Sequence, residues 1–410
     1  MIKNKNIQQV TFLNNLLLFF FSTYPVCFLV GNFFINLYLQ LINLILVYGI
    51  FKNFYTYKIL NRQIIYLLLF LFFSFLVNLI FSNNMGMSFL RIFKFLLIIG
   101  SIIAFKTLIT NLKTSKINKM YKIWFIIFLV VILDIVFEII FGFNILGFKS
   151  FMSGRIASFT GDELKIGGFY FGFILLSLTY IKYNKSNWFI FFLIAFFVTA
   201  YLIGERSNFI KIFLMILPFY FILYNSNVFK KIFYLSIPVI IILLITIADA
   251  KFKQRFFYYF INPIIKNNLE ESLSKDKHIS HYRLAIDIFK NNKLFGVGIK
   301  NFRHESYHRS VNLGHKIAVT THPHQIHLEF LSEIGIIGYI LLMSFLFYTI
   351  FNGFLIYRTK NDITALSATL FIIATILPIL PSGSFFTTYG ATIFWINFSF
   401  ICRHKYNYNK

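Results

Sequence analysis

The sequence predicts an all-α polytopic membrane protein of about twelve transmembrane helices. Hydrophobic residues make up 58% of its 410 residues and aromatic residues 21%, which is more apolar surface than a soluble domain can hide. Apolar runs such as 64–81, 232–247 and 336–357 are long enough to cross a bilayer core about 30 Å thick. These runs are continuous and lack the alternation of a membrane β-barrel, so helices are expected.

Twelve apolar segments are separated by short polar connections, and a Gly31-Asn32 turn divides the first two. Each segment is expected to cross the membrane once. The expected spans lie near 10–31, 33–51, 64–82, 88–105, 123–142, 167–181, 187–203, 207–224, 232–249, 336–357, 363–380 and 387–402.

The charges of the short loops predict the orientation. Twelve crossings put both termini on one side, and most Lys and Arg of the short loops lie on that side. The short loops of the other side hold only Lys149, Arg155, Lys165 and Arg206. Cytoplasmic loops are enriched in Lys and Arg, so both termini are expected in the cytoplasm of a bacterial inner-membrane protein.

One long polar segment interrupts the spans and divides the chain. Residues 1–249 form a nine-helix membrane region, 250–335 a large periplasmic loop between the ninth and tenth helices, and 336–410 a three-helix region with a cytoplasmic tail. Long translocated loops are exempt from the charge rule, so the basic residues of 250–335 do not oppose this topology.

The net charge of +25 does not indicate nucleic-acid binding. The basic residues are spread over many loops and form no stripe or recognised nucleic-acid motif. The two cysteines, Cys27 and Cys402, lie in apolar segments near opposite ends of the chain, which argues against a disulfide framework.

Four charged residues fall inside predicted spans. Arg91 and Lys94 share a face of the fourth span, and Asp134 and Glu138 share a face of the fifth. Counting about 1.5 Å per residue from the outer ends puts Arg91 near the depth of Glu138 and Lys94 near that of Asp134. We expect two compensating interhelical pairs, although charges within a membrane also mark substrate paths.

Arginine is rare here, yet six of ten arginines lie on the outer side: Arg155, Arg206, Arg255, Arg283, Arg303 and Arg309. The guanidinium group binds phosphate oxygens in a bidentate manner, which Lys cannot do. The alternative role for Arg255, Arg303 and Arg309 is anchoring to lipid headgroups. Arg206, in the short turn Gly204-Glu-Arg206-Ser, either faces a polar cavity or is neutralised by Glu205.

Eight of the nine histidines lie in the large loop: His278, His281, His304, His308, His315, His322, His324 and His327. Two interpretations compete. His304 and His308 have helical spacing for a metal, but no nearby Cys or Asp completes such a site. The alternative is acid–base or phosphate chemistry by one histidine.

The segment 321–338 favours the second interpretation. Pro323 breaks the preceding chain, so a helix can begin near His324 with Gln325, Glu329 and Glu333 on one face. Gly335 and Gly338 would let the following span pack closely. His324 would then lie at a helix start on the membrane surface, where a base can act on a lipid-anchored substrate.

This segment resembles the signature of the bacterial O-antigen ligase family: a His followed by Asn, Ser or Gln, nine residues, Gly, two residues and Gly. His324-Gln325 and Gly335-Ile-Ile-Gly338 fit it throughout. Gly204-Glu-Arg206-Ser, the stretch from His281-Tyr-Arg283 to Phe302, and an outer-loop motif at Gly154-Arg155 are also similar to the family. The resemblance is best over residues 150–380.

The resemblance implies a GT-C-like fold and a metal-independent glycosyltransferase that uses no cofactor. Such an enzyme moves a glycan from an undecaprenyl diphosphate carrier to an acceptor hydroxyl at the periplasmic face. Arg206 and Arg283 would bind the diphosphate and His324 would activate the acceptor, with Arg155, Gln325 and Glu329 as further candidates. The other partners would be the acceptor, either lipid A core or a second carrier-linked glycan, and membrane lipids.

Three other functions were weighed against the ligase. An O-antigen or capsule repeat-unit polymerase shares the arginines and the loop, so the sequence does not separate it from a ligase. A flippase would need charges lining a cavity through many spans, whereas here they gather at the outer face. A purely structural membrane scaffold would not need His324 in this motif.

Overall fold

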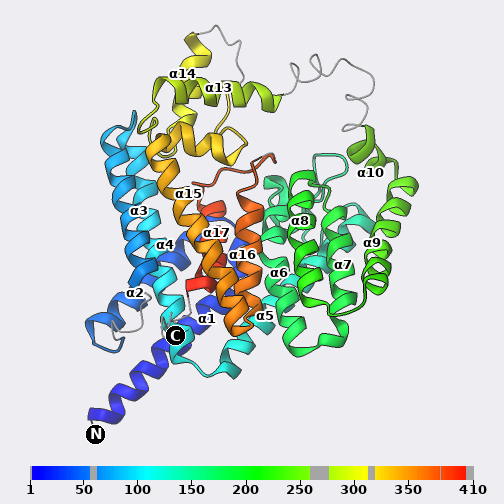
Figure 1. Ribbon diagram of the computed structural model, residues 1–410, viewed down its shortest axis with the longest axis horizontal. Coiled ribbons are helices and arrows are strands. Elements are labelled where there is room, and N and C mark those ends of the chain that lie inside the picture. Colours follow the sequence, from blue (N-terminus) through cyan, green and yellow to red (C-terminus); the bar gives the residue numbers. More distant parts are fainter. Residues whose placement is uncertain (1, 56–61, 259–276, 313–318, 379, 403–410) are drawn as a thin grey trace.

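The computed structural model describes residues 2–55, 62–258, 277–312, 319–378 and 380–402 (Figure 1). Within these ranges the chain forms helices and no strand, as predicted. The longer helices are α1 (Ile2–Val30), α2 (Asn32–Phe51), α3 (Arg62–Ile80), α4 (Met85–Asn111), α5 (Thr114–Phe141), α6 (Ile166–Asn184), α7 (Phe189–Leu202), α8 (Arg206–Leu223), α9 (Val228–Ala248), α13 (Lys277–Asn291), α14 (Phe302–Asn312), α15 (Ile326–Lys360), α16 (Ile363–Thr375) and α17 (Thr388–Cys402). Short helical turns are η2 (Ser158–Glu163), η3 (Ser186–Trp188), α10 (Ala250–Phe252) and η4 (Lys253–Tyr258).

Among the described residues, eight helices are long and apolar enough to cross a membrane: α1, α2, α4, α5, α6, α8, α9 and α15. The polytopic membrane fold is therefore confirmed. Helices α3, α7, α16 and α17 also lie where spans are predicted, so the count of twelve crossings stays a prediction. Gly31, with φ 129°, separates α1 from α2 at the predicted turn.

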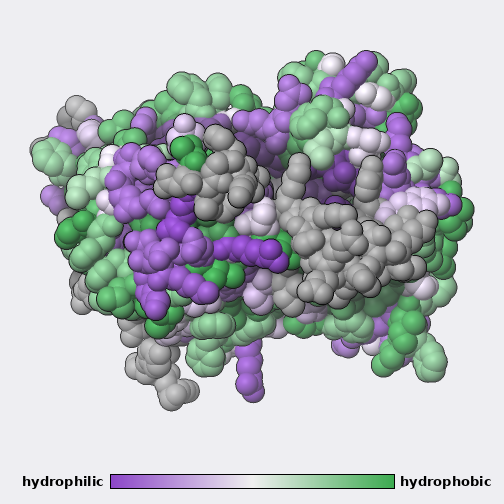
Figure 2. Space-filling model, turned by 90° about the horizontal axis from the view of Figure 1, so that it is seen from above, coloured by the Kyte–Doolittle hydropathy of each residue, from purple (hydrophilic) through white to green (hydrophobic). Residues whose placement is uncertain are grey.

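The helices form one bundle with a polar cap (Figure 1). Helices α15, α16 and α17 run through its middle, α2, α3 and α4 lie on one flank, and α6 to α9 lie on the other. Helices α13 and α14 lie above α15, at what we call the loop end of the bundle, whereas α1 begins at the opposite end. Seen from the loop end, hydrophilic residues gather over the middle and apolar residues form much of the rim (Figure 2).

Aromatic packing fills the core between the helices. Trp124 donates its indole N–H to the carbonyl of Phe21 at 2.8 Å, and the centre of the Tyr170 ring lies 4.5 Å from that of Phe128, with the two rings tilted by 38°. Helix α9 packs on α7 and buries only Pro238 of its side chains. Lipid is as apolar as these side chains, so close packing and satisfied polar groups hold such helices together.

The predicted ion pairs between α4 and α5 are wrong. Asp134 accepts hydrogen bonds from Ile145 N at 2.9 Å and Ser158 Oγ at 2.6 Å. Glu138 accepts from the backbone N–H groups of Ala157 at 2.9 Å and Ser158 at 2.6 Å. The irregular segment after α5 leaves backbone donors without helical partners, and these two carboxylates satisfy them.

The turn between α13 and α14 docks on a bend in α15. Gly335 has φ 66°, and a Cβ there would lie 2.3 Å from the carbonyl oxygen of Leu294. Val297 N donates to Ser332 O and Gly298 N to Glu333 O, each at 2.9 Å. The signature glycine Gly335 therefore serves this bend and close approach, and not the helix packing that the sequence suggested for it.

Candidate active site

His324 lies in the last residues before α15, with φ 60°. Gln325 caps the helix: its Oε1 accepts from Leu328 N at 2.6 Å, and its Nε2 donates to Pro378 O at 2.6 Å. The His324 carbonyl accepts from Ser382 N at 2.8 Å. The helix cap at Gln325 and the hydrogen bond from Ser382 thus fix the backbone of His324. The predicted position of His324 at a helix start is confirmed.

Three other histidines surround the His324 ring. Ring centroids lie 3.9 Å away for His322, 5.2 Å for His278 and 5.3 Å for His281, which stacks nearly parallel. We call these four residues the histidine cluster. His278 and His281 come from one face of α13, whose apolar residues Leu284, Ala285 and Ile288 pack with Val297 and Phe302 into a small second core. That core, with Leu328 of α15 against it, brings the two segments together.

The surroundings of His322 and His324 lower the pKa of both side chains, which keeps these two neutral at physiological pH. The pKa of His324 is lowered to about 4, first by burial and then by the charges of His278 and His281. The pKa of His322 is lowered to about 3 by burial and by the charges of His324, Lys300, His281 and Arg303. Bringing several like charges together out of water disfavours protonation. A neutral imidazole can accept a proton, which is what a general base must do.

The pH dependence of activity should follow from this lowered pKa. Because His324 is neutral above about 4 instead of above its ordinary 6.5, lowering the pH from 7 through 6.5 should leave kcat/KM nearly unchanged. The loss should come as the pH approaches about 4. A kcat/KM profile that falls with a midpoint near 6.5 would contradict this protonation state. The measurement needs a substrate whose own phosphates do not titrate in this range.

A buried lysine, Lys300, stabilises the turn between α13 and α14 near the histidine cluster. Lys300, 2% exposed, donates from Nζ to Ser384 Oγ, and Ser384 in turn donates to Glu329. Lys300 N donates to Glu333 at 2.7 Å, and Phe385 N donates to Glu329 at 2.8 Å. Two carboxylates and one ammonium group thus join the turn, α15 and the segment after α16. We call Lys300, Glu329, Glu333 and Ser384 the lysine clamp.

The other sequence candidates on α15 prove to support the fold. Glu329 is 1% exposed within the lysine clamp, and Gln325 is used as a helix cap. The side-chain oxygen and nitrogen atoms of Gln325 and the carboxylate oxygens of Glu329 are all engaged in hydrogen bonds. His327 also has partners, since its Nδ1 lies 3.0 Å from Tyr339 Oη and its Nε2 2.7 Å from Ile376 O.

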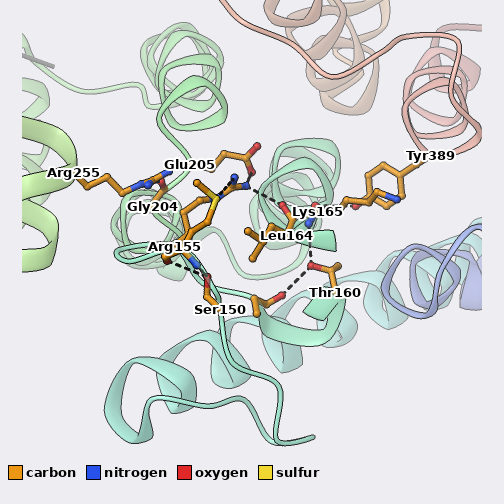
Figure 3. A network of polar contacts seen from close by, with 11 residues as sticks. Ser150, Arg155, Thr160, Leu164, Lys165, Gly204, Glu205, Arg255 and Tyr389 are labelled. Carbon is orange, nitrogen blue, oxygen red and sulfur yellow. Dashed lines mark hydrogen bonds and ion pairs between the residues drawn. The ribbon is translucent and has the colours of Figure 1, made fainter. Parts of the chain in front are cut away.

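A second polar site lies around the start of α8 (Figure 3). Arg155 donates to Leu164 O at 3.0 Å and lies 3.5 Å from Glu205 Oε2. Arg255 donates to Gly204 O and Ser153 O. Gly204, with φ 73°, lets the two segments touch, because a Cβ there would lie 1.8 Å from Gly154 O.

Arg206 lies beside this network without joining it. Glu205 pairs with Arg155, so the interpretation that Glu205 neutralises Arg206 is not supported. Arg206 is half-buried at the first turn of α8 and makes no hydrogen bond or ion pair within the part of the chain that the structure describes. A guanidinium group at a helix N-terminus, with its charge uncompensated, favours an anion. We call Arg155, Glu205, Arg206 and Arg255 the arginine site.

The remaining loop arginines differ in their surroundings. Arg283 is exposed on α13, two residues from His281 and so on nearly the opposite side of the helix. Arg309 pairs with Asp287 and with Glu305. Arg303 is half-buried, and its Nε has no hydrogen-bond partner within the described residues. The structure therefore brings neither Arg283 nor Arg206 into direct contact with His324.

The proposed metal pair does not extend into a larger group. His304 Nε2 and His308 Nε2 lie 3.1 Å apart on α14. Searching the described residues finds no set of three or more His, Cys, Asp or Glu side chains placed to hold a metal ion. Cys27 and Cys402 are free and buried.

One segment joins all of these features. Between α16 and α17, Ser382 binds the backbone of His324 and Ser384 belongs to the lysine clamp. Just beyond it, Tyr389 Oη donates to Lys165 O at 3.1 Å, and Lys165 lies 5.4 Å above the Tyr389 ring, next to the arginine site (Figure 3). Seven residues reach at most about 25 Å, so this segment links the histidine cluster to the surroundings of the arginine site over no more than that span.

Sequence patterns did not single out several of these residues. The sequence predicts no individual role for His278, His281 or His322, and it gives no local signal for Lys300. These residues come together because α13 packs on α15, and the spacing of residues along the sequence does not predict that packing. The excess of histidines in the loop was the one available indication of a cluster.

Residues 189–343 match the model of a protein family described as O-antigen ligase. The matched range begins with α7 and includes Arg206, the histidine cluster, Lys300 and the bend at Gly335. It therefore contains both the turn before α8 and the signature glycines. No curated protein matches the sequence.

Proposed function

We propose that the chain, whose residues 189–343 match the model of a family described as O-antigen ligase, belongs to that family and transfers a glycan from an undecaprenyl diphosphate carrier to an acceptor hydroxyl. We propose lipid A core as the acceptor, which makes the protein an O-antigen ligase. The observation that carries this proposal is the neutral His324 held at the same end of the bundle as the uncompensated Arg206.

Each residue has a role in the proposed reaction. His324 accepts the proton of the acceptor hydroxyl as the hydroxyl oxygen attacks the anomeric carbon of the glycan. A new glycosidic bond forms while the bond from that carbon to the carrier phosphate breaks. The diphosphate leaves with the bonding electrons, and Arg206 and Arg283 stabilise its growing negative charge. Arg155 holds Glu205 away from Arg206 and so keeps Arg206 available.

The proposed reaction needs no metal. A diphosphate is a good leaving group once guanidinium groups balance its charge, and a neutral imidazole suffices to take the hydroxyl proton. Divalent cations would serve the same electrostatic purpose as the arginines.

We place the loop end at the periplasmic face of the inner membrane, with both termini in the cytoplasm. The support is the excess of Lys and Arg in the short loops of the opposite side. A lipid-linked donor and an acceptor in the same leaflet would then both reach the histidine cluster from the bilayer.

The second candidate is a polymerase, which would use another carrier-linked repeat unit as acceptor. The same base and arginines would serve it, and the identity of the acceptor separates the two. A flippase remains a distant alternative, because the charged side chains described above gather near the loop end.

Arg206→Lys tests the donor site. Lys keeps the charge but loses the planar fork, and charge-assisted hydrogen bonds contribute about 1.5–3 kcal/mol each. We therefore expect the Kd for an undecaprenyl diphosphate-linked glycan to rise roughly tenfold or more, measured in nanodiscs. Arg309→Lys is the control, because Arg309 is already paired with Asp287 and Glu305. Equal affinity of the Arg206→Lys variant and wild type would remove Arg206 from the donor site.

A further inference from the structure

An apolar crevice with two positive charges opens beside α4. Its walls come from α2, α3, α4 and α17, from the turn before α17 and from Ile299, and they include the aromatic side chains of Phe75, Phe95, Phe386 and Trp395. Among these side chains lie Arg91 and Lys94, on one face of α4. Arg91 is six residues from the start of α4, so it lies about 9 Å below the loop end.

Within the described residues, Arg91 and Lys94 have a hydroxyl group as their hydrogen-bond partner and no carboxylate. Arg91 NH1 donates to Thr388 Oγ1 at 3.3 Å, and Lys94 Nζ donates to the same oxygen at 3.1 Å. No carboxylate lies within ion-pair distance of either residue in the portion of the chain that the structure describes. The two acids expected to compensate them, Asp134 and Glu138, are occupied by backbone donors of another loop. Glu333 is close enough for its charge to reach Arg91, but Arg303 opposes it there.

Two neighbouring cations without a carboxylate partner are energetically unfavourable in an apolar crevice unless an anion binds between them. Charged side chains within a membrane protein usually pair with each other or mark the path of a ligand. Here two of them share one hydroxyl and face a pocket with aromatic walls. A ligand with a phosphate at one end and a long apolar chain at the other matches both features.

We propose that Arg91, Lys94 and Thr388 bind the phosphate of a lipid substrate whose apolar chain lies in the crevice. This inference deepens the proposed function, because glycan transfer requires two lipid-anchored molecules at once. The arginine site would hold one phosphorylated lipid and the crevice the other. The segment that carries Ser382, Ser384 and Thr388 lies between them and also touches His324.

Two more basic residues, Arg303 and Lys300, connect the surroundings of the crevice with the histidine cluster. Arg303 is close enough to both Arg91 and His322 for its charge to affect each of them. Ile299, in the crevice wall, is adjacent to Lys300 of the lysine clamp. A phosphate held by Arg91 and Lys94 would therefore place its attached group on the side of the cluster, where His324 can reach a hydroxyl.

The chemistry named here is shared by two possible ligands. One is the polyprenyl diphosphate of a carrier, and the other is a phosphorylated glycolipid with acyl chains. Both present a phosphate beside an apolar chain, so the experiment must include each of them.

The test is equilibrium binding to the full-length protein in nanodiscs, without any transfer reaction. The probes are undecaprenyl diphosphate, undecaprenol and a phosphorylated lipid A, each measured with wild type and with Arg91→Gln/Lys94→Gln. We expect wild type to bind one of the two phosphorylated lipids roughly tenfold to a hundredfold more tightly than the double variant does. Undecaprenol should bind both proteins equally. Lys290→Gln, at an exposed position on α13, controls for the loss of a charge at the loop end.

The probe whose affinity falls identifies the ligand of the crevice. Thr388→Val and Arg91→Lys give milder variants if the double variant folds poorly, and each should weaken the same probe. Unchanged affinity of all variants for both phosphorylated lipids would overturn the proposal. Because binding is measured apart from transfer, a wild-type protein that binds lipid but transfers nothing would refute the proposed function and leave this site intact.

Discussion

His324→Ala is expected to lower the rate of glycan transfer by about two to four orders of magnitude, the usual contribution of one general base. The affinity for the carrier-linked donor should be retained, because the arginines proposed to bind the diphosphate do not contact the His324 side chain. The single-turnover rate and the donor Kd, measured on the same nanodisc preparation, separate these two effects. Transfer at the wild-type rate would show that His324 is not the base.

His308→Ala is the matched control for this variant. His308 lies in the same loop, is exposed, and contacts His304 on its own helix. It should retain nearly full activity. His322→Ala is not a neutral control, because the His322 ring lies 3.9 Å from that of His324. Removing it opens the cluster to water and should move the acid limb of the pH profile toward the ordinary histidine pKa.

Lys300→Met is expected to destabilise the protein by about 3–5 kcal/mol, the cost of leaving a buried charge without its partner. Lys300 is 2% exposed, and Glu329 and Glu333 are 1% and 0% exposed. Met has a similar length and can adopt the same backbone conformation, with φ 69°, to the same degree as Lys. The loss is therefore assigned to the ammonium group. Thermal unfolding in detergent, followed by size-exclusion chromatography, should show a markedly lower midpoint.

A second substitution separates charge from packing. In Lys300→Met/Glu329→Gln the carboxylate left behind by the first change is neutralised, so part of the midpoint should return. Lys290→Met, at an exposed position on α13, should unfold like wild type. A double variant whose loss equals the sum of the two single losses would mean that Lys300 and Glu329 do not interact.

Local patterns were sufficient to predict the helices and the helix start next to His324. Continuous apolar runs predict helices because lipid offers the backbone no hydrogen-bond partner. The structure has a helix at the position of each predicted span. Pro323 and the polar residues after it predict a helix start, and α15 begins at Ile326 with Gln325 as its cap. These patterns involve only neighbouring residues, so they can be recognised in a single sequence.

Partnerships between distant segments could not be predicted in the same way. Depth counting matched Arg91 with Glu138, but depth leaves the rotation of each helix undetermined, and Glu138 instead accepts hydrogen bonds from the loop at 157–158. The histidine cluster depends on α13 lying across α15, which follows from the small core around Val297 and Phe302. Gly335 was recognised as significant for the wrong reason, since its positive φ accommodates a loop that sequence spacing does not reveal.

Reconstituted transfer tests the central claim most directly. Purified protein in nanodiscs would receive an undecaprenyl diphosphate-linked glycan together with lipid A core, in the presence of a chelator, and the products would be separated and weighed by mass spectrometry. We predict lipid A core carrying the glycan, formed by wild type and reduced by two to four orders of magnitude in His324→Ala. A product formed only on a second carrier-linked glycan would make the protein a polymerase. No transfer to either acceptor, or activity abolished by the chelator, would contradict the proposed metal-independent glycan transfer at His324.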